Sequence, residues 1–266
     1  MAIDFKHTDK QVIISLTSFP QAIPYAVQSI QSVLNGTVKP DKIVLYLTAS
    51  QFPKSEIPQE LQALSSENPI FEIRNYDDDI RSYRKLIPAL QDFPNDIIVT
   101  VDDDILYGKN MLRDLLRMHK RYPDAIVGHR VRNIKLNEPY RNWKRYKAHR
   151  YLLKSLQPKY GNLQTGGGGT LYPPNSLSVE MLDPKLFKEI APTVDDIWFW
   201  AAAVAKGTKN APVPFGYNKP IEIKKPLEIT LLSINLESHS GRDVNREVFE
   251  RILEQYPIIK RRIENE

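Results

Sequence analysis

Three consecutive aspartates, Asp102-Asp103-Asp104, follow a run of mostly branched apolar residues from Ile97 to Val101. A continuous apolar run predicts a strand near the centre of a parallel sheet, covered on both faces. Ligands bind to such sheets beyond the carboxyl ends of the strands. If the extended conformation continues, Asp102 and Asp104 point to one side, roughly 6–7 Å apart, and Asp103 points to the other. Two carboxylates in this position predict a Mg²⁺ or Mn²⁺ site.

A second pair of carboxylates, Asp195-Asp196, comes at the predicted start of an apolar helix that ends before Gly207. A carboxylate there can act as a general base beside a substrate hydroxyl. It can also stabilise the helix start, because Thr193 and Asp196 have the spacing of a capping box. The pattern leaves both roles open, and one carboxylate could serve each.

Three other segments carry candidate residues. The acidic triplet Asp77-Asp78-Asp79 follows a more polar strand, and we interpret it as a loop that contacts a nucleoside or as a solvated acidic turn. Gly166 to Gly169 lacks the following Lys-Ser or Lys-Thr of a phosphate-binding loop, so the glycines indicate either close backbone approach beside a sugar or a flexible loop. His239 lies in a polar segment, and we interpret it as either a metal ligand or a solvated side chain.

The elements that must position these residues follow a regular order. Strands and helices alternate over the first hundred residues, which predicts βα units on a parallel sheet. The expected strands are Val12–Leu16, Lys42–Leu47, Phe71–Arg74 and Ile97–Val101. After residue 128 the pattern loosens, with helices expected at Asp196–Lys206 and Asp243–Tyr256 and an irregular stretch at 208–230. We therefore expect an α/β fold, a mostly parallel sheet flanked by helices, in one compact unit.

Composition narrows the class of protein. The chain has 266 residues, and 41% of them are hydrophobic, enough for a full core. No apolar run approaches the roughly 18 residues needed to cross a bilayer, and the first residues lack the pattern of a signal peptide. The chain contains no cysteine, which excludes disulfides and thiolate metal sites. We expect a cytoplasmic protein.

The net charge of +5 is unevenly distributed. Between Arg130 and Lys154 every charged residue except Glu138 is basic, and aromatic residues are interleaved with them. Such a segment can bind nucleic acid, anionic lipid headgroups or a phosphorylated acceptor, or can be a solvated helix face. The absence of a known nucleic-acid-binding signature argues against nucleic acid. Peripheral contact with the inner face of the membrane is consistent with the basic segment.

In their order along the chain these motifs resemble the bacterial glycosyltransferases of the GT-A fold, notably the family-2-like enzymes of capsule and surface-polysaccharide synthesis. The resemblance covers most of residues 11–205, from the opening strand and loop to Asp195-Asp196. It implies transfer of a sugar, with inversion, from a nucleotide-diphosphate donor such as a UDP-sugar to a glycan or lipid-linked glycan. Residues 1–128 would bind the nucleotide sugar, and residues 129–266 would bind the acceptor and supply a C-terminal helix. The Gln-x-x-Arg-Trp motif of processive synthases is missing, which favours addition of a single sugar.

The resemblance also implies roles for individual residues. Asp104 would be the main ligand of Mn²⁺ or Mg²⁺, with Asp102 and His239 as further ligands, and Asp196 would be the base, or Asp195 if the register shifts by one. The residues implied to contact the nucleotide sugar are Thr17, Ser18, Phe19, Asp78, Lys85, Asp102, Asp103, Gly167, Gly168 and Arg242.

Two alternatives remain. A sugar nucleotidyltransferase also combines a parallel sheet, carboxylates and Mg²⁺, but its glycine-rich signature near the first strand is missing. A non-catalytic module that binds carbohydrate or a membrane surface on the same fold would lack turnover.

Overall fold

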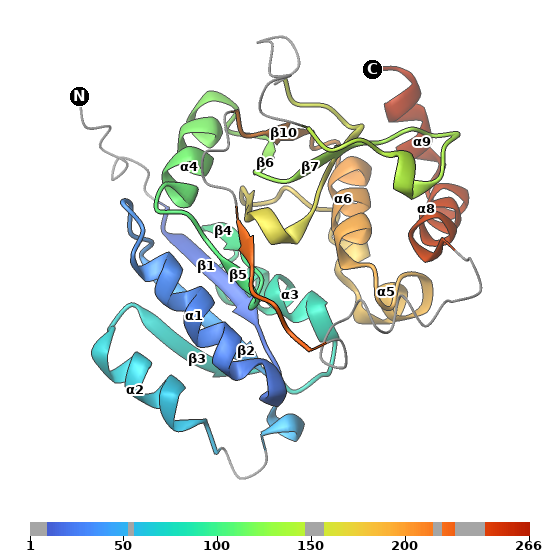
Figure 1. The fold of residues 1–266 in the computed structure, drawn as a ribbon. Helices are drawn as coiled ribbons and strands as arrows, with labels where there is room; N and C mark the ends of the chain where they lie inside the picture. Colours follow the sequence, from blue (N-terminus) through green and yellow to red (C-terminus); the bar gives the residue numbers. More distant parts are fainter. Residues whose placement is uncertain (1–9, 53–55, 147–156, 215–219, 227–242) are drawn as a thin grey trace.

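The computed structural model describes residues 10–52, 56–146, 157–214, 220–226 and 243–266. Within them the chain forms an α/β fold around a seven-stranded, mostly parallel sheet in the order β10-β6-β9-β4-β1-β2-β3, flanked by helices (Figure 1). The expected fold class is confirmed at this level.

The first half of the chain builds one side of the sheet. Its strands are β1 Val12–Thr17, β2 Lys42–Leu47, β3 Phe71–Asn75 and β4 Ile97–Thr100. β1 pairs in parallel with both β2 and β4, and β2 pairs in parallel with β3. The four predicted strands are therefore confirmed, with ends that differ by no more than one residue.

The second half completes the same sheet. β6 Ile126–Gly128 and β10 Asn210–Pro212 are parallel to each other, and β9 Thr170–Tyr172 lies antiparallel between β4 and β6. The prediction that residues 208–230 are irregular was wrong for β10 and for β11 Ile221–Glu222. A three-residue strand is too short to show a periodicity, and Pro212 is tolerated because β10 is the edge strand.

Helices cover both faces of the sheet and bury an apolar cluster on each. α1, α2 and α4 pack on the face that carries Ile14, Val99 and Leu171, whereas the other helices pack on the face that carries Ile13 and Ile98. This is the pattern of strands buried on both faces. The helices are α1 Ile23–Leu34, α2 Gln59–Glu67, α3 Ile87–Asp92, α4 Met111–Arg121, α5 Pro184–Ile190, α6 Asp195–Lys206, α8 Val244–Gln255 and α9 Pro257–Glu264.

Residues 81–92 form two short helical elements rather than one continuous helix. A 3₁₀ turn at Arg81–Lys85 precedes α3, and Pro88 lies in the first turn of α3. Proline has no N–H and disfavours a helical conformation in the residue before it, so a helix begins at this point more readily than it continues through it. The division places Lys85 at the end of the 3₁₀ turn.

Two short antiparallel pairs lie beside the main sheet. β5 Ile105–Leu106 pairs with β11 Ile221–Glu222, and β7 Val131–Asn133 pairs with β8 Asn162–Gln164. In Figure 1, β11 lies close to the carboxyl end of the central strands. Among the residues that the structure describes, no helix combines the length and the apolar character needed to span a bilayer.

Candidate functional site

The carboxyl ends of β1 and β4 lie next to each other at the point where the strand order reverses. The chain passes from β1 to β2 and β3 on one side of β1 and returns to β4 on the other. Ligands bind to open α/β sheets at such switch points. Ser18, just after β1, donates a 2.6 Å hydrogen bond from Oγ to Oδ2 of Asp103, just after β4. The two loops therefore form one site.

The backbone of the aspartate triplet is held from two sides. The Ser29 hydroxyl of α1 donates to the carbonyl oxygen of Asp102 at 2.9 Å, and the N–H of Asp102 donates to the Tyr107 hydroxyl at 2.8 Å. These hydrogen bonds fix where the triplet leaves the sheet.

The chain does not remain extended through the triplet, because it turns at Asp103 and Asp104 before β5 begins at the buried Ile105. The condition under which Asp102 and Asp104 were expected to point to one side is therefore not met. Lys225 lies 2.9 Å from Asp103 Oδ1 and 3.3 Å from Asp104 Oδ2. Asp103 and Asp104 therefore share one cation.

Asp102 is held by a different cation, the buried Lys85. The Lys85 ammonium lies 2.9 Å from Asp102 Oδ1 and 3.0 Å from Asp195 Oδ2. Burial lowers the pKa of Lys85, but the carboxylates of Asp102, Asp195 and Asp196 outweigh it and raise the pKa well above its ordinary value. Lys85 thus remains charged and joins the end of β4 to the start of α6.

Asp196 lies beside this ion pair. It accepts a 3.0 Å hydrogen bond on Oδ1 from the N–H of Gly166. Burial, followed by the charge of Asp195, raises the pKa of Asp196 to about 7. The N-cap residue of α6 is Val194, and no side chain caps the helix. The capping box that the sequence allowed is therefore not formed, and Asp196 points to the glycine loop instead.

The glycine loop is a buried 3₁₀ turn at Gly166–Gly168 rather than an exposed flexible loop. A Cβ on Gly166 would lie 2.7 Å from Lys85 Nζ and 2.9 Å from Asp102 Oδ1. A Cβ on Gly168 would lie 2.7 Å from the backbone nitrogen of Arg130. Side chains at these positions would force the neighbouring groups apart, so the glycines allow the loop to pack against the carboxylates.

The loop after β1 has further contacts. The Thr17 hydroxyl donates to the carbonyl oxygen of Tyr46 at 2.8 Å and accepts from Arg84 at 3.3 Å, and Lys225 lies 5.9 Å from the centre of the Phe19 ring. The structure therefore brings Thr17, Ser18 and Phe19 to the edge that carries the aspartates.

The acidic triplet at residues 77–79 reaches this loop through Asp79 rather than through Asp78. The buried Arg84 donates to Asp79 Oδ1 at 2.7 Å and also contacts Thr17. Asp78 instead forms an exposed ion pair with Lys188 of α5.

Two residues of the site, Arg84 and Lys225, had no signal in the sequence. Arg84 contacts Thr17 and Lys225 contacts Asp103, and both contacts join segments that are far apart in the chain. Lys225 lies in a proline-rich stretch without periodicity, and β11 carries it to the aspartates. Other sequence candidates lie outside the described residues: His239, Arg242, Lys147, Arg150, Tyr151 and Lys154.

The carboxylates can be compared with what a divalent cation requires. The side chains of Asp102 and Asp104 are 28% and 39% exposed to solvent, so solvent and ligands can reach both. In the described ranges no group of three or more His, Cys, Asp or Glu side chains is arranged to hold a metal. One or two carboxylates suffice for Mg²⁺ or Mn²⁺ when phosphate and water supply the remaining oxygens. The residues fit a cation that arrives with a phosphate ligand rather than a closed protein site.

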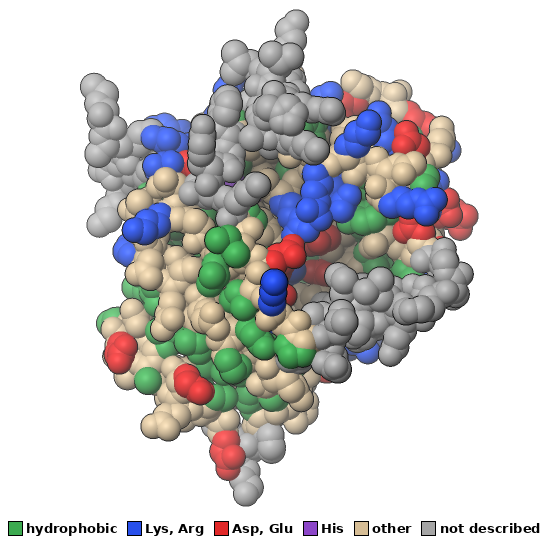
Figure 2. Space-filling view, in the orientation of Figure 1, with side chains coloured by type: hydrophobic (Ala, Val, Ile, Leu, Met, Phe, Trp, Pro, Cys, Tyr) green, Lys and Arg blue, Asp and Glu red, His purple; other side chains and the backbone are tan. Residues whose placement is uncertain are grey.

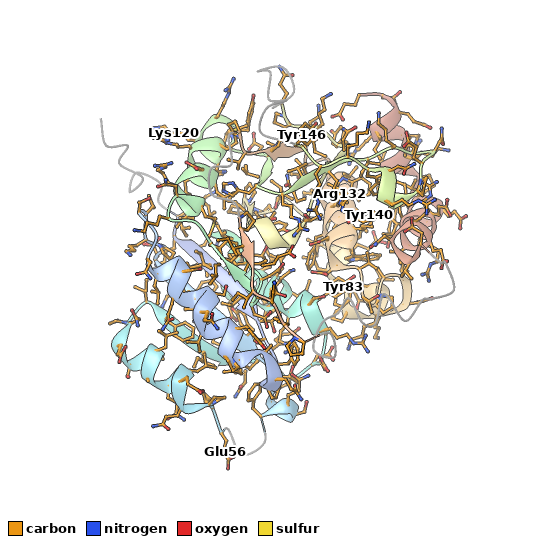
Figure 3. All side chains as sticks on the ribbon, in the orientation of Figure 1. Glu56, Tyr83, Lys120, Arg132, Tyr140 and Tyr146 are labelled. Carbon is orange, nitrogen blue, oxygen red and sulfur yellow. The ribbon has the colours of Figure 1, made fainter. Side chains whose placement is uncertain are left out.

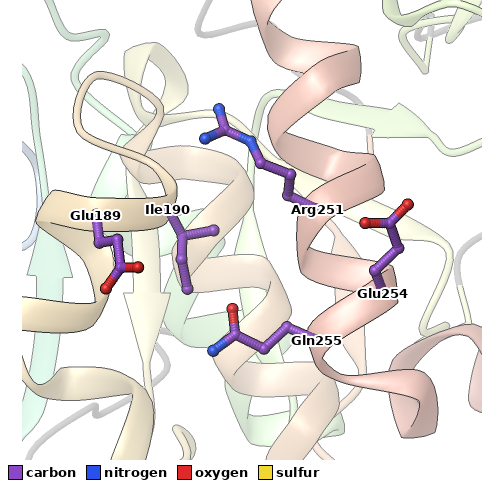
Figure 4. Close-up of a pocket in the computed structure, with 5 residues that line it drawn as sticks. All are labelled: Glu189, Ile190, Arg251, Glu254 and Gln255. Atoms are coloured by element: carbon purple, nitrogen blue, oxygen red, sulfur yellow. The ribbon is translucent and has the colours of Figure 1, made fainter.

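Two hollows on the surface lie away from these carboxylates. One, of about 430 Å³, lies between α5 and α8 and is lined by Glu189, Ile190, Arg251, Glu254 and Gln255 (Figure 4). The other, of about 540 Å³, lies near His119 and Pro173. Neither is lined by any of the aspartates described above. The pKa values of Lys85, Asp103, Asp104 and Asp196 are all shifted, and such groups tend to gather at functional sites.

The chain matches no protein-family model, and a comparison with curated proteins finds no significant match. The arrangement of Asp102, Asp104, Lys85 and Asp196 is therefore the best indication of what the site can do. Figure 2 shows Lys and Arg side chains gathered beside acidic ones near the centre of the face that carries β11.

Proposed function

We propose that this chain is a metal-dependent glycosyltransferase of the GT-A fold, which transfers a single sugar with inversion from a nucleotide-diphosphate sugar, such as a UDP-sugar, to a glycan or lipid-linked glycan in polysaccharide synthesis. One observation carries the proposal. Lys85 bridges Asp102 at the end of β4 and Asp195 at the start of α6. The ion pair brings a carboxylate site for a cation and a candidate base, Asp196, into one site.

The donor half of the site would use the ends of β1 and β4. Thr17, Ser18 and Phe19 line the switch point, where a nucleotide is expected to bind. A divalent cation held by Asp104 and Asp102 would neutralise the charge that develops on the departing nucleotide diphosphate. The partly exposed carboxylates of Asp102 and Asp104 support this assignment.

The acceptor half would use Asp196. Its pKa of about 7 suits a general base, because such a group is both partly deprotonated and basic enough to accept a proton near neutral pH. In the proposed reaction an acceptor oxygen forms a bond to the anomeric carbon, and its proton passes to Asp196. The bond between that carbon and the phosphate oxygen breaks, and its electron pair leaves with the nucleotide diphosphate.

The fold supports the GT-A assignment only in part. A mostly parallel sheet with its ligand edge at β1 and β4 is what the assignment requires. The second half of the chain contributes Asp195, Asp196 and the glycine loop, which agrees with an acceptor-binding role for that half.

The direct test is calorimetric titration of UDP and GDP, with and without Mn²⁺. The wild type is compared with Asp104→Asn and with a control, Asp124→Asn, which changes an exposed acid elsewhere. We expect one nucleotide to bind only with Mn²⁺, the Asp104→Asn variant to lose that binding, and the control to retain it.

Three results would contradict the proposal. Absence of nucleotide binding under every condition would favour a non-catalytic carbohydrate-binding module. Formation of a nucleotide sugar from a nucleoside triphosphate and a sugar phosphate would favour a nucleotidyltransferase. Metal-dependent nucleotide binding that survives in Asp104→Asn would exclude Asp104 as the main ligand.

A further inference from the structure

Three arginines form a cluster beside the β7–β8 pair. Arg130 lies in the bend before β7, two residues from Arg132, and its carbonyl oxygen accepts from Thr165 N–H at 2.9 Å. Arg145 pairs with Arg132 in an antiparallel bridge. Directly opposite residues of such a bridge have neighbouring side chains on one face.

The three guanidinium groups influence one another electrostatically. Burial lowers the pKa of Arg145, and Arg130 and Arg132 lower it further. Like charges placed opposite each other in a ladder destabilise it. Within the described ranges the only ion pair of this cluster joins Arg130 Nη1 to Glu222 Oε1, at 3.1 Å. The arrangement therefore has an excess of positive charge that an external anion would neutralise.

Tyr140 lies next to the arginine cluster and within electrostatic reach of the candidate base, Asp196. The Arg132 guanidinium lies 4.7 Å from the centre of the Tyr140 ring, and both residues lie side by side in Figure 3. Burial raises the pKa of Tyr140, and the charge of Asp196 raises it further, whereas the three arginines lower it. The charges of both Asp196 and the arginines therefore act on the Tyr140 hydroxyl. An acceptor whose hydroxyl meets Asp196 would extend across Tyr140 to the arginine cluster.

Arg130 also borders the glycine loop. A Cβ on Gly167 would lie 2.5 Å from Arg130 Nη1 and 3.7 Å from Asp102 Oδ2. Gly167 thus separates the arginine cluster from the carboxylates of the proposed donor site by the width of one small residue. A ligand in the arginine cluster would be adjacent to the donor but would not need to share its cation.

We propose that Arg130, Arg132 and Arg145 bind a phosphate group carried by the acceptor, so that the acceptor of the proposed transfer is a phosphorylated molecule. The inference rests on the proposed function for the identity of the acceptor. Guanidinium groups bind phosphate oxygens through paired, charge-assisted hydrogen bonds, which suits this cluster. Two sources share this chemistry: a sugar phosphate and a lipid diphosphate.

Glu222 supports an anion site at this place. Its carboxylate is 71% exposed, yet it contacts Arg130, and its charge also acts on Arg145. A carboxylate thus occupies one side of the cluster and would compete with phosphate. Removal of this carboxylate should strengthen phosphate binding, whereas removal of an arginine should weaken it. Opposite effects of two neighbouring substitutions are difficult to produce by a general change in structure.

The test is calorimetric titration, without divalent metal, of inorganic pyrophosphate, glucose 6-phosphate and farnesyl diphosphate. The variants are Arg145→Gln, Arg132→Lys and Glu222→Gln, and the matched control is Arg141→Gln, which removes an exposed charge from the same segment. We expect Arg145→Gln to weaken pyrophosphate binding about tenfold or more. Arg132→Lys should retain part of the affinity, Glu222→Gln should increase it, and Arg141→Gln should leave it unchanged. Tighter binding of glucose 6-phosphate or of farnesyl diphosphate identifies the source.

A second titration separates this inference from the proposed function. Nucleotide diphosphate with Mn²⁺ should bind Arg145→Gln as tightly as it binds the wild type. If Arg145→Gln weakens that binding as much as it weakens pyrophosphate binding, the cluster belongs to the donor site and the inference is wrong. Pyrophosphate binding that is absent, or equally weakened by Arg141→Gln, also overturns it. If the wild type binds pyrophosphate but no nucleotide, the proposed function is rejected and the anion site is retained.

Discussion

Lys85 Nζ lies 3.0 Å from Asp195 Oδ2, and this contact joins a turn in the first half of the chain to a helix in the second. The same ammonium group contacts Asp102 at 2.9 Å. One buried cation therefore determines how the end of β4 and the start of α6 are placed relative to each other.

Replacing Lys85 should destabilise the fold. Lys85→Met removes the counter-charge of the poorly exposed Asp195 and of the partly exposed Asp102, which we expect to cost about 3 kcal/mol of unfolding free energy at pH 7.5. The pKa of Lys85 is raised in the folded state, so its contribution is complete below the unfolded pKa near 10.5 and is lost as pH rises through the folded value. Urea unfolding at pH 7.5 and above pH 11 measures the difference. Lys120→Met, at an exposed position of α4, should change stability by less than about 0.5 kcal/mol. Equal stability of the Lys85 and Lys120 variants would contradict the ion pair.

Replacing Lys225 should strengthen metal binding. The Lys225 ammonium lies 3.3 Å from Asp104 Oδ2, where its charge opposes the approach of another cation. Lys225→Gln should increase the affinity for Mn²⁺ alone by roughly threefold to tenfold. Electron paramagnetic resonance of free Mn²⁺ measures this affinity directly. The neighbouring exposed Lys224→Gln serves as the control, and an equal increase in both variants would show a general charge effect instead.

The proposed base should give activity a distinct pH dependence. Asp196 must be deprotonated to accept a proton, so kcat/KM should rise with pH and level off above about 7, the pKa of its carboxyl. Because Asp195 and Lys85 interact with Asp196, the measured value belongs to the cluster. Asp196→Asn should lower transfer by about 10²-fold to 10⁴-fold and leave Mn²⁺-dependent nucleotide binding unchanged. A wild-type profile that is flat between pH 5 and 8 would rule out this role.

The same carboxyl should affect stability, which can be measured without an acceptor. The carboxyl of Asp196 has a pKa of about 7 in the folded state and near 3.9 in the unfolded chain, so the folded state binds its proton more tightly. Asp196 therefore lowers the stability of the fold as pH rises from about 4 to about 7. Asp196→Asn keeps an acceptor oxygen for Gly166 N–H and carries no charge. The variant should therefore be more stable than the wild type at pH 8, by on the order of 2 kcal/mol, and similar to it at pH 4. Thermal unfolding at both pH values tests the sign of the stability difference. A variant that is less stable than the wild type at pH 8 would show that the charge of Asp196 is well compensated in the fold.

Two neighbouring glycines should tolerate alanine differently. A Cβ on Gly168 meets the backbone nitrogen of Arg130 at 2.7 Å, which cannot move without disturbing the β7–β8 pair. A Cβ on Gly167 meets the end of the Arg130 side chain, which can rotate away. Gly168→Ala should therefore cost about 2 kcal/mol, and Gly167→Ala should cost much less. Thermal unfolding of the two variants provides the comparison; equal losses would mean that the loop moves as a whole.

The strands of the first half could be predicted because a buried strand has a recognisable local pattern of apolar residues. β1, β2 and β4 are covered on both faces, so their sequences are continuous apolar runs that a short window detects. The aspartates after β4 could be placed at the ligand edge for the same reason. Strands of three residues in the second half have no such pattern, and β10 was predicted as irregular chain.

The roles of the charged groups depended on contacts between distant segments. The sequence by itself determined the α/β class, the order of the principal elements and the position of Asp102 to Asp104 after a central strand, because these follow from local hydrophobic pattern. Only the tertiary structure decided that the triplet turns, that Lys225 joins Asp103 and Asp104, and that Asp196 faces the glycine loop instead of capping α6. Electrostatic interactions and burial depend on contacts between segments that are far apart in the sequence. A short stretch of sequence does not show which distant segments form those contacts.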